Sequence, residues 1–191
     1  MFVRKKKYYL FIENTREFNV NLIKIRNKFN IIYRNRKKEE EIRNLIKFRN
    51  KCRERGVAFY VSNNTLLLSK LKADGLYISA HNKNLLLNIY SKLGYKIIGS
   101  AHNQSEINIK EKQGCKAIMY SRIFKTDYTY KKGFLGLQKF NIISLRSKID
   151  LVPLGGINKT NLIKLNSVMC NSFACLSLIK KKPAKVINRL F

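Results

Sequence analysis

Short apolar segments rich in β-branched and aromatic residues alternate along the whole chain with longer segments of helical periodicity. The predicted strands are residues 8–12, 30–33, 58–61, 75–78, 96–100, 117–120, 151–154 and 173–176. The predicted helices between them are residues 20–29, 38–55, 65–71, 84–93, 105–113, 137–146 and 160–166. Repeated strand–helix units build a parallel sheet with right-handed crossovers, so this alternation restricts the chain to the α/β class.

Eight such units favour a closed sheet over an open one. The sequence therefore predicts a (β/α)8 TIM barrel, with an open doubly wound sheet as the alternative. At 191 residues the chain is short for this fold. We expect one barrel domain over residues 1–191, with only a brief last helix after Pro183.

Two local signals support the predicted helices. Gly56, Gly94 and Gly114 each follow a helical segment, where a left-handed glycine commonly ends a helix. Acidic residues at 39–41 lie at the start of the 38–55 segment, where negative charge opposes the positive end of the helix dipole. Both signals place the helix ends close to the strand boundaries.

The chain is strongly basic, with 40 Lys and Arg against 11 Asp and Glu and a net charge of +29. Such a charge attracts polyanions, but the basic residues are spread along the chain and no RNA-recognition or zinc-finger pattern accompanies them. Specific nucleic-acid binding is therefore not favoured. The apolar runs are far shorter than the roughly 20 residues that cross a bilayer, so no membrane association is expected.

The cysteines are not spaced as metal ligands or as a redox pair. Cys52, Cys115, Cys170 and Cys175 form no CxxC pattern, and the two histidines do not complete a zinc set. We expect reduced thiols in a cytoplasmic protein. A homo-oligomer remains open.

Polar residues follow almost every predicted strand. In parallel α/β folds the functional site lies at the carboxyl ends of the strands. Gly155 and Gly156 follow the seventh strand, where paired glycines let backbone N–H groups approach a phosphate. Ser177 follows the eighth strand and is expected beside them. This end of the sheet is therefore the candidate phosphate site.

Several of these segments, taken in order, resemble the thiamine phosphate synthase and thiazole tautomerase (TenI-like) superfamily. They are Arg34-Asn35-Arg36, Ala73-Asp74-Gly75-Leu76-Tyr77, Gly99-Ser100-Ala101-His102, Ile123-Phe124-Lys125-Thr126, Gly155-Gly156-Ile157 and Leu176-Ser177. The resemblance covers nearly the whole chain. It implies a transferase of thiamine biosynthesis that joins hydroxymethylpyrimidine diphosphate to a thiazole phosphate and releases pyrophosphate through a pyrimidine carbocation.

The resemblance also implies roles for individual residues. Arg34 and Arg36 would hold the diphosphate, on which negative charge grows as the bond breaks. Ser100 would face the pyrimidine, and His102 is a candidate acid or base whose alternative is a structural histidine. The thiazole phosphate would be bound by Thr126, Gly155, Gly156 and Ser177. The expected partners are small-molecule phosphate esters.

The chain departs from the family at the expected magnesium ligands. Asn63 stands where the family has an aspartate after the third strand, and Asn82 stands where it has a metal-binding aspartate after the fourth. Because Mg²⁺ prefers anionic oxygen ligands, we expect at most weak Mg²⁺ binding and no other cofactor.

Three functions remain open at this point. The first is an active synthase in which Arg and Lys partly replace the metal. The second is a degenerate relative that only binds or tautomerises a thiazole phosphate or a similar ester. The third is a basic nucleic-acid-binding protein on a barrel scaffold, and the fold alone does not choose among them.

Overall fold

The computed structural model describes residues 7–35, 40–126 and 133–175. Its eight strands form a closed parallel barrel in the order β1-β2-β3-β4-β5-β6-β7-β8. The strands are β1 (Lys7–Ile12), β2 (Phe29–Tyr33), β3 (Ala58–Ser62), β4 (Gly75–Ile78), β5 (Lys96–Ala101), β6 (Ala117–Ser121), β7 (Asp150–Leu154) and β8 (Ser172–Cys175). Pairing of β8 with β1, with Tyr8 opposite Phe173, closes the sheet. The predicted (β/α)8 barrel is therefore confirmed, and the open sheet is excluded.

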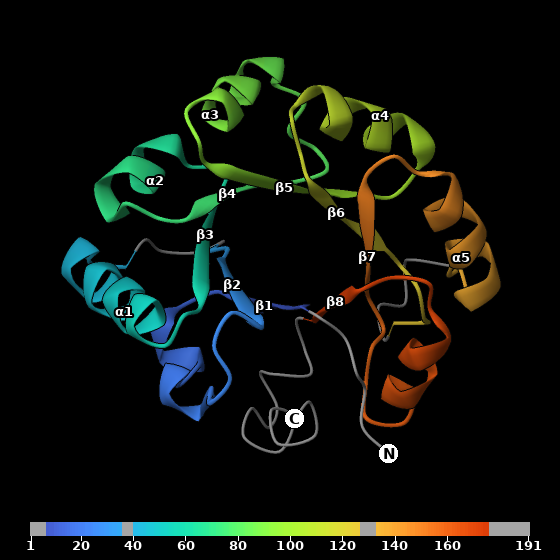
Figure 1. Ribbon diagram of the computed structural model, residues 1–191, viewed down its shortest axis with the longest axis horizontal. Helices are drawn as coiled ribbons and strands as arrows, with labels where there is room; N and C mark the ends of the chain where they lie inside the picture. The colour runs from blue at the N-terminus through green and yellow to red at the C-terminus, as the bar shows by residue number, and fades with distance from the viewer. Residues whose placement is uncertain (1–6, 36–39, 127–132, 176–191) are drawn as a thin grey trace.

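Helices surround the barrel, as Figure 1 shows for α1 through α5. The helices are α1 (Ile42–Glu54), α2 (Thr65–Leu71), α3 (Asn88–Lys92), α4 (Gln104–Lys112) and α5 (Leu137–Arg146). Shorter 3₁₀ turns are η1 (Thr15–Glu17), η2 (Val20–Leu22), η3 (Leu85–Leu87) and η4 (Leu162–Ser167). No helix of the described segments is long and apolar enough to cross a membrane.

Two apolar cores follow from the alternation of side chains along each strand. On β1, Tyr8 and Leu10 point outward and pack with helix residues such as Leu45, whereas Tyr9 and Phe11 belong to a separate cluster. That second cluster draws its buried residues from all eight strands, so it fills the inside of the barrel: Tyr9, Phe11, Ile32, Tyr60, Tyr77, Ile98, Ala117, Met119, Val152 and Ala174. The barrel is thus a packed core and not a pore.

The helix predicted over 20–29 is wrong. Only the 3₁₀ turn Val20–Leu22 forms there, and β2 begins at Phe29. Asn27 adopts a left-handed conformation with φ of 59°, and its N–H donates to the carbonyl of Gly56, so the chain turns instead of continuing a helix. The β-branched and Asn residues of this segment are weak helix formers, and Ile23 is buried in the core between the barrel and the helices.

Two other predicted helices differ from the structure, one in where it starts and one in its helix type. Helix α1 begins at Ile42 with no acidic residue in its first turn. The carboxylate of Glu40 instead accepts hydrogen bonds from the backbone N–H and hydroxyl of Thr15. The segment predicted as a helix over 160–166 is the 3₁₀ turn η4. Gly56, Gly94 and Gly114 take positive φ angles of 64°, 86° and 78°, as predicted for left-handed helix ends.

Candidate functional site

A cleft lies at the carboxyl ends of β2 and β3, with a volume of about 520 Å³. Its lining residues are Arg34, Asn35, Ser62, Asn63, Asn64, Thr65 and Leu66. The backbone N–H of Arg34 donates to the carbonyl of Ile12 at 2.8 Å, which anchors this residue to the end of β1. The half-buried Arg34 guanidinium lies over the Tyr77 ring, 5.9 Å from its centroid. A cationic group therefore stands at the mouth of the barrel, where an anion could reach it.

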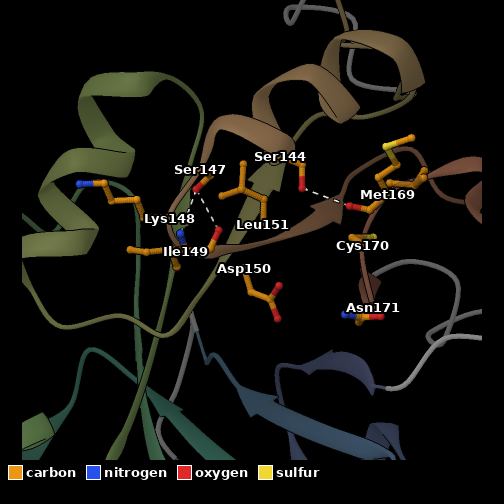
Figure 2. Close-up of a pocket in the computed structure, with 10 residues that line it drawn as sticks. Ser144, Ser147, Lys148, Ile149, Asp150, Leu151, Met169, Cys170 and Asn171 are labelled. Atoms are coloured by element: carbon orange, nitrogen blue, oxygen red, sulfur yellow. Dashed lines mark hydrogen bonds between the residues drawn. The ribbon is translucent and has the colours of Figure 1, made fainter.

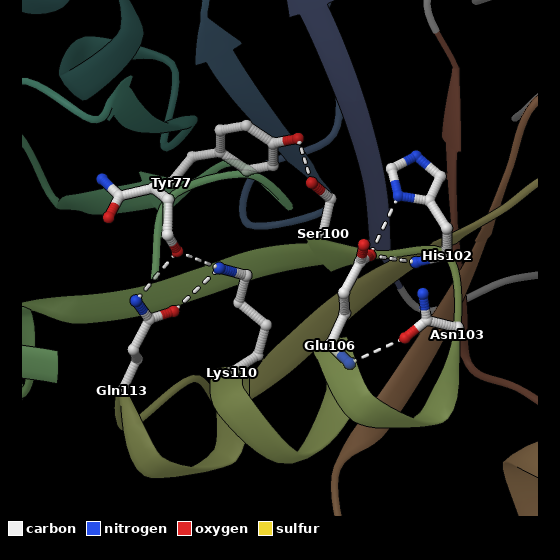
Figure 3. A network of polar contacts seen from close by, with 8 residues as sticks. Tyr77, Ser100, His102, Asn103, Glu106, Lys110 and Gln113 are labelled. Atoms are coloured by element: carbon white, nitrogen blue, oxygen red, sulfur yellow. Dashed lines mark hydrogen bonds and ion pairs between the residues drawn. The ribbon is translucent and has the colours of Figure 1, made fainter. Parts of the chain in front are cut away.

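Tyr77 connects Arg34 to Ser100. The Tyr77 hydroxyl donates to the Ser100 hydroxyl at 2.8 Å, and Ser100 is only 6% exposed (Figure 3). The Tyr77 ring also packs edge-on against Phe11, with centroids 5.3 Å apart. Two predicted site residues, Arg34 after β2 and Ser100 on β5, thus both contact Tyr77, one over its ring and one at its hydroxyl.

Asn63 and Asn82 are in direct contact. The Asn63 side-chain oxygen accepts from the Ser79 backbone N–H at 3.0 Å and from the Asn82 side-chain amide at 3.2 Å. The Asn82 side-chain oxygen in turn accepts from the Asn84 N–H at 3.0 Å. The two positions expected to hold a metal therefore lie side by side, but their oxygens accept hydrogen bonds from the protein itself.

This pair of amides does not fit a magnesium site. Mg²⁺ is held through carboxylates and waters, and neither Asn63 nor Asn82 supplies an anionic oxygen. In residues 7–35, 40–126 and 133–175, no group of three or more His, Cys, Asp or Glu side chains could hold a metal ion. Arg34 is the cationic side chain among the described residues that line this cleft.

His102 is tied to Glu106 at the start of α4. The Glu106 carboxylate accepts from the His102 backbone N–H at 2.7 Å and contacts the ring Nδ1 at 2.9 Å (Figure 3). The rings of His102 and His81 lie 6.2 Å apart between centroids. Burial raises the pKa of Glu106, but the His102 hydrogen bonds and charge together outweigh this, and the net shift is downward.

This downward shift predicts a pH-dependent contribution of Glu106 to stability. We expect Glu106→Gln to lower the free energy of unfolding by about 1–2 kcal/mol at pH 7. A carboxyl whose folded pKa is depressed stabilises the fold above its unfolded pKa of about 4.3, and this stabilisation is lost as pH falls through the folded value. Urea unfolding at pH 7 and pH 3 measures the difference. A deficit of equal size at both pH values would contradict the prediction.

A second group of predicted residues meets after β6 and β7. The Arg122 guanidinium donates to the Thr126 hydroxyl at 2.9 Å, and the Phe124 N–H donates to the Gly155 carbonyl at 3.2 Å. Gly156 has φ of 68°, and a Cβ there would lie 2.4 Å from the carbonyl oxygens of Phe124 and Lys125. Only glycine allows these two loops to approach so closely.

Gly155 and Gly156 form the turn that directly follows β7, with positive φ angles of 97° and 68°. The Gly156 carbonyl is held by the Asn161 side-chain amide at 2.8 Å, which fixes the orientation of this turn. A glycine turn of this kind, beside Thr126 and Arg122, can offer backbone N–H groups to a phosphate oxygen. Arg36 and Ser177, the other predicted anion-binding residues, lie outside the described residues.

Another cavity, of about 480 Å³, lies at the opposite end of the barrel (Figure 2). It is lined by Ser144, Ser147, Lys148, Ile149, Asp150, Leu151, Val168, Met169, Cys170 and Asn171. Asp150 is the first residue of β7, so this cavity is at the amino ends of the strands. None of the predicted site residues lines it. It is therefore separate from the candidate site.

Cysteine chemistry is not part of the site. Cys52, Cys115, Cys170 and Cys175 are all free thiols. Burial raises the pKa of Cys115 and of Cys175 to about 12, so neither forms a thiolate near neutral pH.

Several functional candidates were missing from the sequence prediction. The roles of Tyr77 and Arg122 were missed because their hydrogen bonds to Ser100 and Thr126 form only when the chain folds. Arg122 directly follows β6, a position at which a basic residue could have been noticed. Two buried residues, Lys110 of α4 and Gln113 at its C-cap, gave no signal, because charged and amide residues of a helix are ordinarily solvent-exposed.

Comparison with known proteins identifies relatives over most of the chain. The family described as Thiamine monophosphate synthase matches residues 4–179. A thiamine-phosphate synthase of Prochlorococcus marinus is 30% identical over 131 residues, which is 67% of this chain and 37% of the relative. The corresponding protein of Pelagibacter ubique is 28% identical over 165 residues, covering 81% of this chain and 78% of the relative. This chain thus spans well under half the length of the Prochlorococcus relative.

Solved structures show the same fold. A thiamine phosphate pyrophosphorylase from Pyrococcus furiosus superposes with a TM-score of 0.73 at 19% identity, covering 98% of this chain and 94% of the other. A 4-hydroxy-2-oxoglutarate aldolase superposes with a TM-score of 0.63 at 11% identity, covering 98% and 96%. At these identities the likeness concerns the barrel alone.

Proposed function

Because the chain belongs to the thiamine monophosphate synthase family, we propose that it joins hydroxymethylpyrimidine diphosphate to thiazole phosphate in thiamine biosynthesis. The observation that carries this proposal is the cleft in which Arg34 and Asn63 lie together at the carboxyl ends of β2 and β3. Such a cleft offers a cation and amide groups to a diphosphate beside the open end of the barrel.

In this reaction the bond between the pyrimidine methylene carbon and the diphosphate oxygen breaks. The bonding electron pair leaves with pyrophosphate, and a pyrimidine carbocation remains. The lone pair of the thiazole nitrogen then forms the new carbon–nitrogen bond. Arg34, aided by Arg36, stabilises the charge that grows on the departing pyrophosphate. The position of the Arg34 guanidinium over the Tyr77 ring directs it toward the mouth of the barrel, where the leaving group would lie.

Ser100 and His102 serve the pyrimidine side of the site. The Ser100 hydroxyl accepts from Tyr77 and keeps its own proton for a substrate acceptor. The His102 ring, 42% exposed and held by Glu106, can exchange a proton with substrate or solvent. Both residues come from β5 or the turn that follows it, so one strand end positions them together.

The thiazole phosphate binds at the loops after β6 and β7. Its oxygens accept hydrogen bonds from the N–H groups of Gly155 and Gly156 and from the Thr126 hydroxyl, with Ser177 contributing after β8. The close contact of Gly156 with the 124–125 carbonyls keeps these donors in place before the ligand arrives. Binding energy at this half of the site orients the thiazole nitrogen toward the carbocation.

The reaction is expected to depend only weakly on magnesium. We expect removal of divalent metal with EDTA to change kcat/KM less than about threefold, because Asn63 and Asn82 supply no carboxylate. The assay measures thiamine phosphate formed from both precursors, with and without Mg²⁺. The matched variant is Asn63→Asp/Asn82→Asp, which we expect to gain a clear response to Mg²⁺. Strong Mg²⁺ dependence of the unaltered protein would contradict the proposal.

A second function is favoured by the same amide pair. If the diphosphate half has lost its activity, the protein binds or tautomerises a phosphate ester at Gly155 and Gly156. Two measurements separate the two functions. For the second function, titration calorimetry would show thiazole phosphate binding, whereas the activity assay would show no thiamine phosphate formed with or without Mg²⁺.

A further inference from the structure

Two polar side chains at the C-terminal end of α4 are completely buried, each 0% exposed: Lys110 of the helix and Gln113, which caps it. Figure 3 shows the Lys110 ammonium and the Gln113 amide directed toward the same backbone carbonyl. That carbonyl belongs to Asn82, which accepts from Lys110 Nζ at 2.7 Å and from Gln113 Nε2 at 3.0 Å. Gln113 also donates to the Asn84 carbonyl at 2.9 Å, and its own oxygen accepts from Lys110 at 2.8 Å. Three hydrogen bonds therefore fasten the loop after β4 to the C-terminal end of α4, and the fourth joins Lys110 to Gln113.

This arrangement is costly for the fold. A buried ammonium is unfavourable unless it is compensated, and no carboxylate of the described residues lies within 4 Å of Lys110. The barrel also makes room for the lysine stem. Gly99 lies against it, and a Cβ at Gly99 would be 2.8 Å from Lys110 Cδ. Apolar side chains would fill the same space without this penalty, so packing alone does not account for the pair.

The fastened loop leads directly to the diphosphate cleft. The side-chain amide of Asn82 donates to Asn63, and Asn63 lines the cleft together with Arg34. The chain of contacts therefore runs from α4, through the Asn82 backbone and side chain, to Asn63. It joins the loops after β3 and β4, which a metal ion with ligands on both loops would otherwise join.

We propose that Lys110 and Gln113 are positioning residues for diphosphate binding, which fix the Asn82 backbone so that Asn82 can hold Asn63 in the cleft. This inference rests on the proposed function, since it assigns the cleft to a diphosphate. The pair acts through hydrogen bonds to carbonyl oxygens and does not touch the substrate. Hydrogen-bond donors of the protein thereby join the loops after β3 and β4, in place of a metal ion bound by carboxylates on both loops.

The test uses Gln113→Glu and Gln113→Leu, with inorganic pyrophosphate as the probe. Glutamate keeps the size and the acceptor for Lys110 but removes both N–H donors, and leucine removes them without adding charge. For both variants we expect pyrophosphate affinity to fall about tenfold by titration calorimetry. We also expect faster hydrogen exchange in residues 79–84, while the affinity for thiazole phosphate stays within twofold. Lys110→Met should behave in the same way.

The matched control is Gln104→Glu, which makes the same change of charge on an exposed residue at the start of α4. It should leave pyrophosphate binding and loop exchange unchanged. Loss of affinity in Gln113→Glu but not in Gln113→Leu would indicate charge repulsion alone and overturn the inference. Unaltered exchange in residues 79–84, or unaltered pyrophosphate affinity in both variants, would also overturn it. A parent protein that binds no pyrophosphate would instead refute the proposed function, and the inference with it.

Discussion

Replacement of Arg34 by glutamine is expected to lower kcat/KM for the pyrimidine diphosphate by about 10²–10³-fold. The Arg34 guanidinium is the cationic group among the described residues that line the cleft. In the proposed reaction, the negative charge that it faces increases as pyrophosphate departs. Its contribution is therefore larger in the transition state than in the ground state, so most of the loss should appear in kcat. Steady-state kinetics with the diphosphate as the varied substrate measure the effect.

Two further variants define the cause. Arg34→Lys retains the charge but loses the planar fork and its position over Tyr77, and should recover only part of the activity. Arg43→Gln removes a cation from the exposed surface of α1 and should leave the kinetics unchanged. If Arg43→Gln were as harmful as Arg34→Gln, the overall positive charge of the protein, and not this cleft, would be responsible.

Gly156→Ala is expected to weaken thiazole phosphate binding by about 100-fold, a loss of roughly 2.7 kcal/mol. The new methyl group would meet the carbonyl oxygens of Phe124 and Lys125 at 2.4 Å, and the backbone φ of 68° disfavours any side chain. The 124–126 loop or the glycine turn must move, and the N–H donors move with it. Titration calorimetry with thiazole phosphate gives the affinity, and a urea melt gives the accompanying loss of stability.

Gly94→Ala is the control for backbone strain. Gly94 has φ of 86°, but nothing lies within 4 Å of an added Cβ. This variant should lose about 1 kcal/mol of stability and none of the phosphate affinity. Equal affinities for the parent, Gly94→Ala and Gly156→Ala would remove the glycine turn from the phosphate site.

The strands could be predicted because each is a short apolar segment whose pattern does not depend on its neighbours. The strand 75–78 and the helices 65–71 and 137–146 occur with the predicted bounds. The segment 20–29 could not be predicted in the same way. Its apolar residues are compatible with a helical face, but the turn at Asn27 depends on a contact with Gly56, far away in the sequence.

The candidate site was predictable to the level of strand ends, because the carboxyl ends of parallel strands converge. The contacts within it were not. Tyr77 meets Ser100 only because inward-facing residues of β4 and β5 share the barrel interior. The burial of Lys110 depends on Gly99 lying beneath it, and no pattern within α4 reveals this. Glu40 was assigned to a helix start, whereas its carboxylate binds Thr15 on a neighbouring loop.

The closure of the barrel by β1 and β8 has a practical consequence for handling the protein. Lys7 begins β1 at the end remote from the candidate site, whereas Cys175 ends β8 at the rim that carries it. The chain therefore enters β1 at the far side of the barrel and leaves β8 at the rim that carries the candidate site. A probe attached to the exposed side chain of Lys7 would thus lie away from the candidate site in the binding measurements above.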